Sequence, residues 1–193
     1  ILAVIALPLL YFFVLPSHAK TRIDVFLNPN LDPRGSGYNV LQSKLAIGSG
    51  KLFGMGIKNG SQTQLGYLYP QTTDFIYSAI GEEMGFIIAA LVIVLYLILI
   101  TKAIYVAKTA KDDLGSYIAA GIAGIFLFHM VENIGMTMGL LPITGVPLPF
   151  VSYGLTSLVS LFIGMGLVMN VGLQSSAYNK ELKKKLDLKK YVT

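Results

Sequence analysis

The chain contains no cysteine and no tryptophan among its 193 residues, and only 13% of its residues are charged. Without cysteine it can form neither a disulfide nor a cysteine-ligated metal site. A soluble domain usually carries about 25% charged residues. About half that proportion, with a hydrophobic share of 54%, is typical of a membrane protein. We therefore expect membrane-spanning helices.

The positive charge is concentrated at the C-terminal end. Residues 174–193 hold six lysines against Glu181 and Asp187, a local charge of +4 out of a net +5. This pattern is typical of a basic tail beside a membrane and not of a nucleic-acid-binding surface. We expect membrane lipids as neighbours of the tail and no nucleic-acid partner.

Four apolar stretches predict the fold. Residues 1–17 are apolar throughout, without an initiator Met, a basic flank or a cleavage site, so we expect a truncated first span and not a signal peptide. Uncharged or nearly uncharged stretches at 84–101, 114–141 and 155–173 predict three more spans. The prediction is an all-α, polytopic membrane helix bundle with four transmembrane segments, in which a long loop carries short helices. We expect one membrane domain over 1–193.

Lysines set the expected orientation. The short connection at 102–113 and the tail at 174–193 are both Lys-rich, and two spans separate them. Short basic flanks stay on the cytoplasmic side, so we expect a cytoplasmic C-terminus in the plasma membrane. The loop 18–83 and the proline-rich stretch 142–154 are then extracellular.

The loop 18–83 allows two interpretations. Turn-forming residues cluster near Asn28 and Asp32, glycines recur from 48 to 60, and a short amphipathic helix is expected over Tyr38–Ile47. Gly50-Lys51 is followed by Leu52, so the stretch is no phosphate-binding P-loop. The loop is either a flexible surface segment or one that folds back over the membrane and lines a cavity.

Two long motifs occur in a fixed order. The first runs Gln71-Thr-Thr-Asp-Phe-Ile-Tyr77 and continues at Gly81-Glu-Glu-Met-Gly-Phe86. The second begins with Asn133-Ile-Gly-Met136 and continues as Gly139-Leu-Leu-Pro-Ile-Thr-Gly-Val-Pro-Leu-Pro-Phe-Val-Ser-Tyr-Gly154. Together with Gln42-Ser43 and the stretch 46–50, they resemble the SEDS family of shape, elongation, division and sporulation proteins. One departure is Leu155, where the family usually has a second glycine.

The resemblance implies a peptidoglycan glycosyltransferase. Such a protein polymerises lipid II into a nascent glycan strand at the outer face of the bacterial plasma membrane, with a class B penicillin-binding protein as its cross-linking partner. Family members are about twice as long, so the chain resembles their C-terminal part. The sequence of residues 144–150 is more similar to RodA than to FtsW, which implies a role in cell elongation and shape.

Glycosyl transfer needs a base beside the acceptor hydroxyl, and Asp74 is the candidate. The residues alone favour a cap on the apolar helix that follows, whereas the family resemblance implies that Asp74 is the catalytic base. For substrate binding, the family-like motifs point to Gln42, Ser43, Lys44 and Ser152. Lys44 is also the preferred cation for the leaving group. It is chosen from five of the six basic residues of the loop, which are Arg22, Arg34, Lys44, Lys51 and Lys58.

Glu82 is the last candidate. If 74–84 formed one helix, Glu82 would lie about 80° round from Asp74 and could share its cavity, while Glu83 would anchor the helix at the interface. Two carboxylates could hold a divalent cation, although their spacing is no metal signature. No other cofactor is expected.

Further polar residues lie within the span 114–141. His129, Glu132 and Asn133 share one helical face. They can serve either structural pairing or catalysis.

Two other function classes remain open from sequence. A lipid II flippase would carry ionisable residues at the middle of several spans, and here only His129 and Glu132 qualify. A non-catalytic scaffold of the cell-wall machinery would need no essential carboxylate.

Overall fold

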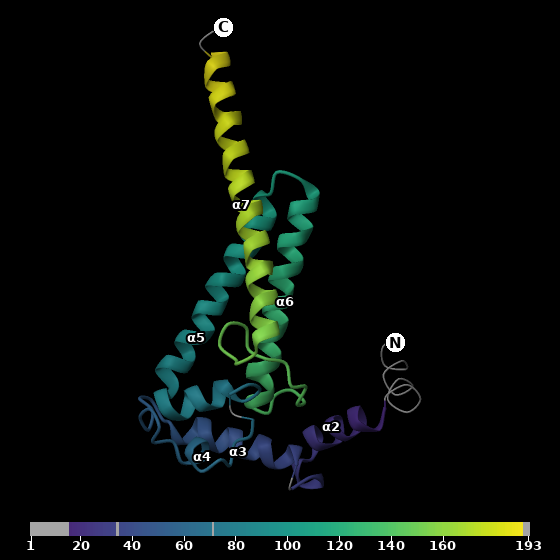
Figure 1. Cartoon of the computed structure of the whole chain (residues 1–193), viewed down its shortest axis with the longest axis vertical. Coiled ribbons are helices and arrows are strands. Elements are labelled where there is room, and N and C mark those ends of the chain that lie inside the picture. Colours follow the sequence, from purple (N-terminus) through teal and green to yellow (C-terminus); the bar gives the residue numbers. More distant parts are fainter. Residues whose placement is uncertain (1–15, 34, 71, 191–193) are drawn as a thin grey trace. The chain divides into compact units, whose positions relative to one another are not determined.

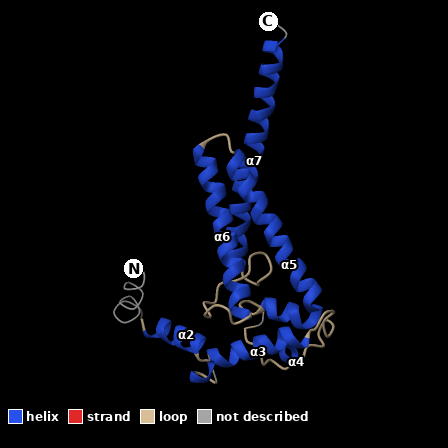
Figure 2. Ribbon diagram, turned by 180° about the vertical axis from the view of Figure 1, so that it is seen from behind, coloured by secondary structure: helices blue, strands red, loops and turns tan. Residues whose placement is uncertain are grey.

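A computed structural model describes residues 16–33, 35–70 and 72–190. These residues form helices and loops without any strand (Figure 2), which confirms the all-α prediction. The elements in chain order are α2 (Ser17–Leu27), η2 (Pro29–Leu31), α3 (Ser36–Ser49), α4 (Ser61–Gln64), α5 (Ile76–Thr109), α6 (Asp113–Thr137) and α7 (Leu155–Lys190). The first expected span, at 1–17, lies outside the described residues except for its last two positions.

Three described helices are long and apolar enough to cross a membrane, at Ile76–Thr109, Asp113–Thr137 and Leu155–Tyr178. They correspond to the spans expected at 84–101, 114–141 and 155–173. The last helix continues past its span, so α7 also includes most of the basic tail. Leu155 is the first residue of α7 and its side chain is exposed. Because a helix start needs no positive φ, this position does not depend on glycine.

The span on α6 ends four residues earlier than expected. Gly139 has a φ of 67°, in the left-handed region. The Leu140 N–H donates to the Gly135 carbonyl and the Gly139 N–H donates to the Met136 carbonyl. These two bonds form a Schellman motif, which closes the helix before the proline-rich segment begins.

Contacts divide the chain into two compact units. The first consists of Ile1–Ala89 with Glu132–Leu148, and the second of Ala90–Val131 with Pro149–Thr193. The single membrane domain expected from the sequence stays a prediction.

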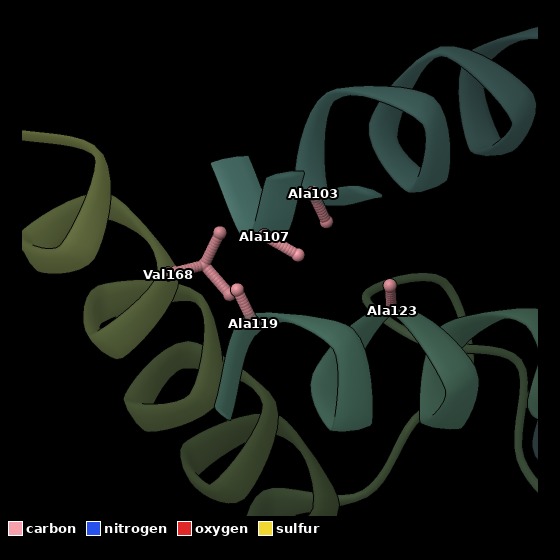
Figure 3. Close-up of a cluster of buried hydrophobic side chains, with 5 residues drawn as sticks. All are labelled: Ala103, Ala107, Ala119, Ala123 and Val168. Carbon is pink, nitrogen blue, oxygen red and sulfur yellow. The ribbon is translucent and has the colours of Figure 1, made fainter. Parts of the chain in front are cut away.

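In the second unit, alanines let three helices approach closely. Ala103 and Ala107 of α5, Ala119 and Ala123 of α6, and Val168 of α7 form one buried cluster (Figure 3). Small side chains at such contacts bring helix backbones together in a membrane, where packing drives association. The Ser175 hydroxyl of α7 also donates to the Thr109 carbonyl at the end of α5.

In the first unit, α3 is bound to both long helices. The Ser43 hydroxyl donates to the Thr137 carbonyl at 2.6 Å. Because that uses its only proton, the Ser78 hydroxyl is the donor in the 2.6 Å bond to Ser43. Ala46 packs with Leu68, Phe75 and Ile143 in a second apolar cluster. The expected helix over 38–47 is confirmed as part of α3, and α2, α3 and α4 show that much of the loop is folded.

Helix α5 is interrupted at Gly85, whose φ is 80° and ψ is −179°. Figure 1 shows α5 changing direction close to its N-terminal end. The break separates two amide donors from their helical acceptors. In an unbroken helix the N–H of residues 86 and 87 would donate to the carbonyls of residues 82 and 83.

The glycine-rich loop at 50–56 fills this break. The Phe86 N–H donates to the Lys51 carbonyl (2.9 Å) and the Ile87 N–H to the Leu52 carbonyl (3.3 Å). In return the Glu82 and Glu83 carbonyls accept from the N–H of Met55 (2.9 Å) and Gly56 (3.0 Å). Two helical hydrogen bonds are thus replaced by four between loop and helix. Every backbone group freed at these four helix positions therefore has a partner.

Glycine is required where the two backbones meet. A Cβ at Gly85 would collide with the backbone of residues 52–54, and one at Gly54 would collide with the backbone of residues 83 and 84. Both glycines also have φ near 80°, which a residue with a Cβ rarely adopts. The glycine at position 54 therefore serves the close contact between the loop and α5 and not a phosphate-binding loop.

We expect Gly85→Ala to destabilise the protein. The backbone conformation of Gly85, with φ 80° and ψ −179°, is essentially limited to glycine and costs about 1–3 kcal/mol for a residue with a Cβ, and the collision adds to this. The measurement is thermal unfolding of the purified protein in detergent, followed by loss of the monodisperse chromatographic peak. Gly48→Ala in α3 is the control, because no atom lies within 4 Å of its Cβ position and alanine favours a helix by about 0.5–1 kcal/mol. Equal stability of Gly85→Ala and wild type would contradict the strain at Gly85.

Candidate functional site

Asp74 lies in the turn that precedes α5 and is half-buried. The turn is held by a backbone hydrogen bond from the Phe75 N–H to the Pro70 carbonyl at 3.3 Å. Phe75 is buried in the apolar cluster around Ala46. The neighbouring side chain thus fixes the turn, and the Asp74 carboxyl is left outside the hydrophobic cluster.

Asn133 of α6 connects this turn to the proline-rich segment. Its Nδ2 donates to the Asp74 carbonyl at 2.9 Å and to the Val146 carbonyl at 2.8 Å. The side chain is fully buried, and its Oδ1 has no hydrogen-bond partner in the described part of the chain. Both amide protons are therefore committed to holding two backbone segments, separated by about 70 residues in sequence, beside one another.

The proline-rich segment passes directly over the Asp74 carboxyl. A Cβ on Gly145 would lie 3.3 Å from Asp74 Oδ2, and Gly145 has a φ of 78°. The adjacent Thr144 hydroxyl donates to Glu132 Oε1 at 2.8 Å. Glu132 is thus engaged by the segment, which favours the structural alternative considered for this intramembrane carboxylate.

Two cations lie along the same segment. Arg22 of α2 donates through Nη1 to the carbonyls of Ile143 (2.9 Å) and Thr144 (3.0 Å). The Lys44 side chain of α3 crosses the Cα of Gly139 so closely that a Cβ there would collide with it. Arg22 and Lys44 also line one small cavity of about 20 Å³, room for about one water molecule. Positive charge therefore flanks the segment that covers Asp74.

Glu82, expected beside Asp74, is placed differently. It is fully buried, and its two oxygens accept the N–H groups of Gln62 at 2.8 Å and Thr63 at 3.0 Å. Glu83 Oε1 accepts from the Gln64 side chain at 3.3 Å. Both carboxylates thus hold the α4 region against α5. Because Asp74 precedes α5, the single helix over 74–84 from which the Glu82 position was inferred is not formed.

The remaining sequence candidates lie in three settings. Ser43 is fully buried in the hydrogen bonds that join α3 to α5 and α6, and Gln42 beside it is half-buried. Ser152 is buried and belongs to the second compact unit. Among the candidates, the structure brings Asp74 and Lys44 to one backbone segment, 139–146. It adds Arg22 and Asn133 to them.

A divalent cation finds little support at these residues. No cluster of three or more His, Cys, Asp and Glu side chains suits a metal ion within the described ranges. Both oxygens of Glu82 already accept backbone N–H groups, which a chelating role would displace. A divalent cation at these carboxylates therefore stays a prediction.

The chain belongs to the FtsW/RodA/SpoVE family, because the family model described as "Cell cycle protein" matches residues 1–177. The chain is 39% identical to the peptidoglycan glycosyltransferase MrdB of Escherichia coli K12, over 91% of this chain and 48% of that protein. It is 44% identical to the peptidoglycan glycosyltransferase RodA of Treponema pallidum, over 82% and 36%. It is 42% identical to the stage V sporulation protein E of Bacillus subtilis, over 80% and 42%.

A solved structure has the same fold. It is a peptidoglycan synthase complex that coordinates polymerization and crosslinking, with a TM-score of 0.68 and 26% identity over 90% of this chain and 48% of the matched chain. The chain thus spans about half the length of the proteins it matches. The suspected family is confirmed, as is the resemblance to part of a longer protein.

We expect Asn133→Ala to loosen both segments that it joins. The loss of two buried hydrogen bonds costs about 1–3 kcal/mol. Hydrogen–deuterium exchange should become faster over 72–75 and 144–148, while the secondary structure is retained. Asn30→Ala is the control, because this exposed side chain lies in η2. Unchanged exchange in both segments of Asn133→Ala would show that the amide does not hold them.

Proposed function

We propose that the protein containing this chain is a peptidoglycan glycosyltransferase that polymerises lipid II. The observation that carries the proposal is the position of the Asp74 carboxyl against Gly145, under a segment bonded by Arg22 and flanked by Lys44. The names of the E. coli and T. pallidum relatives support this activity. A scaffold would have no need for a carboxylate at this position.

The proposed reaction is a single displacement at the sugar carbon of the donor. The acceptor hydroxyl oxygen attacks this carbon, its proton passes to the Asp74 carboxylate, and the bond from carbon to the lipid diphosphate breaks. The departing diphosphate takes the electron pair of that bond. Arg22 and Lys44 supply positive charge where this negative charge develops, which lowers the barrier. Asn133 acts as a positioning residue through the backbone of Asp74.

We propose the outer face of the bacterial plasma membrane as the location of this reaction. The rule for short basic flanks predicts a cytoplasmic position for Lys102, Lys108 and Lys111, at the C-terminal end of α5 and in the turn after it, and for the basic end of α7. Two spans separate these stretches, so Asp74 at the start of α5 faces outward.

We further propose a role in cell elongation and shape. The support is the amino-acid sequence of residues 144–150, which is more similar to RodA than to FtsW. Overall identity does not separate the roles, because RodA, FtsW and stage V sporulation relatives lie at 44%, 41% and 42%. The whole-cell phenotype of a depleted strain would test this point, since loss of rod shape and loss of septation look different.

Asp74→Asn should abolish polymerisation of lipid II by the full-length protein purified with its partner. The change removes the base and keeps the size of the side chain. Because a general base contributes about 10²–10⁴-fold, we expect at least a 100-fold loss of glycan product on gels. Asp113→Asn at the exposed start of α6 is the matched control and should retain wild-type activity.

The same experiment separates the other function classes. Full activity of Asp74→Asn would exclude this residue as the base. Movement of lipid II between vesicle leaflets without polymer in the wild type would favour a flippase. A protein that binds its partner but makes no glycan in any form would favour a scaffold.

We propose that a groove in the second unit receives the membrane helix of a class B penicillin-binding protein. The groove has a volume of about 410 Å³ and is lined by residues of α5 and α6, which are Ile100, Ile104, Ala107, Lys108, Ser116, Ala120, Ala123, Gly124 and Leu127. The small residues in its lining suit close helix packing. The solved complex of polymerization and crosslinking supports such a partner.

Gly124→Leu should weaken this association. No atom lies within 4 Å of a Cβ at Gly124, so a leucine fits the chain itself but fills the groove. We expect co-purification of the partner to fall, while the variant alone stays folded. Gly166→Leu on α7, whose Cβ position is equally open, is the control. Retained co-purification of Gly124→Leu would place the partner elsewhere.

A further inference from the structure

The loop that fills the break in α5 carries exposed apolar side chains. Phe53 is 81% exposed, Ile57 66% and Leu52 58%. They lie among residues whose backbone is tightly held, because the loop makes four hydrogen bonds to the helix break. Large apolar side chains on a firmly held loop indicate a surface that meets something other than water.

The hydrogen bonds fix the level of this loop along the helix. Residues 84–101 carry no charge, and at about 1.5 Å per residue they extend about 27 Å, close to the roughly 30 Å of a bilayer core. Phe86 and Ile87 stand at the beginning of this stretch. Because their N–H groups donate to the Lys51 and Leu52 carbonyls, the loop lies at the boundary of the hydrocarbon region.

The same hydrogen bonds allow α5 to break at the boundary of the hydrocarbon region. An unpaired backbone group in lipid costs several kcal/mol, and the loop supplies partners to the carbonyls and N–H groups that Gly85 separates. The exposed Phe86 and Ile87 of the helix extend the apolar surface of the loop. Loop and helix therefore both carry exposed apolar side chains at this level.

Two lysines border the apolar residues. Lys51 and Lys58 are both exposed and both have positive φ, 50° and 62°. Such φ values are uncommon for residues with a Cβ and persist only where the surrounding structure imposes them. Ammonium groups on either side of apolar side chains match the phosphate layer above an acyl region.

We propose that residues 51–58 form a membrane-inserted loop, in which Leu52, Phe53 and Ile57 enter the acyl region of the phospholipid leaflet at the start of α5, while Lys51 and Lys58 bind lipid phosphates. The loop fixes the depth of the break at Gly85. It thereby fixes the depth of the short helical segment 76–84 that leads back to Asp74. The proposal does not depend on the glycosyltransferase activity.

The test uses nitroxide labels on single cysteines in the full-length protein, purified alone and placed in phosphatidylethanolamine–phosphatidylglycerol vesicles. This chain contains no cysteine, and any cysteine elsewhere in the protein is replaced by serine. The labelled variants are Phe53→Cys and Ile57→Cys. Ile98→Cys within α5 serves as the lipid control and Lys111→Cys between α5 and α6 as the water control.

We expect the labels at 53 and 57 to collide more often with oxygen, which partitions into lipid, than with a water-soluble nickel chelate, as at 98. The label at 111 should show the reverse. A preference for the nickel chelate at 53 and 57 would place the loop in water and overturn the proposal. Low collision with both reagents at these positions would mean that protein covers the loop, which would also overturn it.

Discussion

The constraint on which much of the first unit depends is the pairing of backbone groups at Gly85. A membrane helix cannot leave N–H and C=O groups unpaired in lipid, yet α5 breaks where its uncharged stretch begins. The loop at 50–56 resolves this conflict with four hydrogen bonds. Because glycines at 54 and 85 allow the two backbones to meet, α5 can change direction just beyond the helical segment that starts near Asp74.

The environment of Asp74 depends on a second set of contacts. Asn133 Nδ2 donates one hydrogen bond to the Asp74 carbonyl and one to the Val146 carbonyl of the proline-rich segment. Arg22 and Glu132 bind the same segment. An irregular segment with several prolines has few internal hydrogen bonds, so side chains from α2 and α6 supply its partners. These contacts hold the segment beside the Asp74 carboxyl.

Several features were predictable because they depend on local sequence. Long uncharged stretches indicate spans by length and hydrophobicity alone, and three were confirmed. The motifs around Asp74 and Asn133 were specific enough to indicate the family. Glu82 shows the limit of such inference. Its expected position beside Asp74 rested on one regular helix over 74–84. In the structure the Glu82 carboxylate instead accepts hydrogen bonds from the backbone N–H groups of residues 62 and 63.

By itself the sequence determined the membrane class, the helical fold, the family and Asp74 as the candidate base, because composition and motif sequences are local properties. The tertiary structure alone decided which residues meet. It placed Arg22 and Lys44 at the segment over Asp74, gave Asn133 its two acceptors and inserted the glycine-rich loop into α5. These contacts join residues 13 to 122 positions apart, and the backbone groups that require them become unpaired only after the helices break and end.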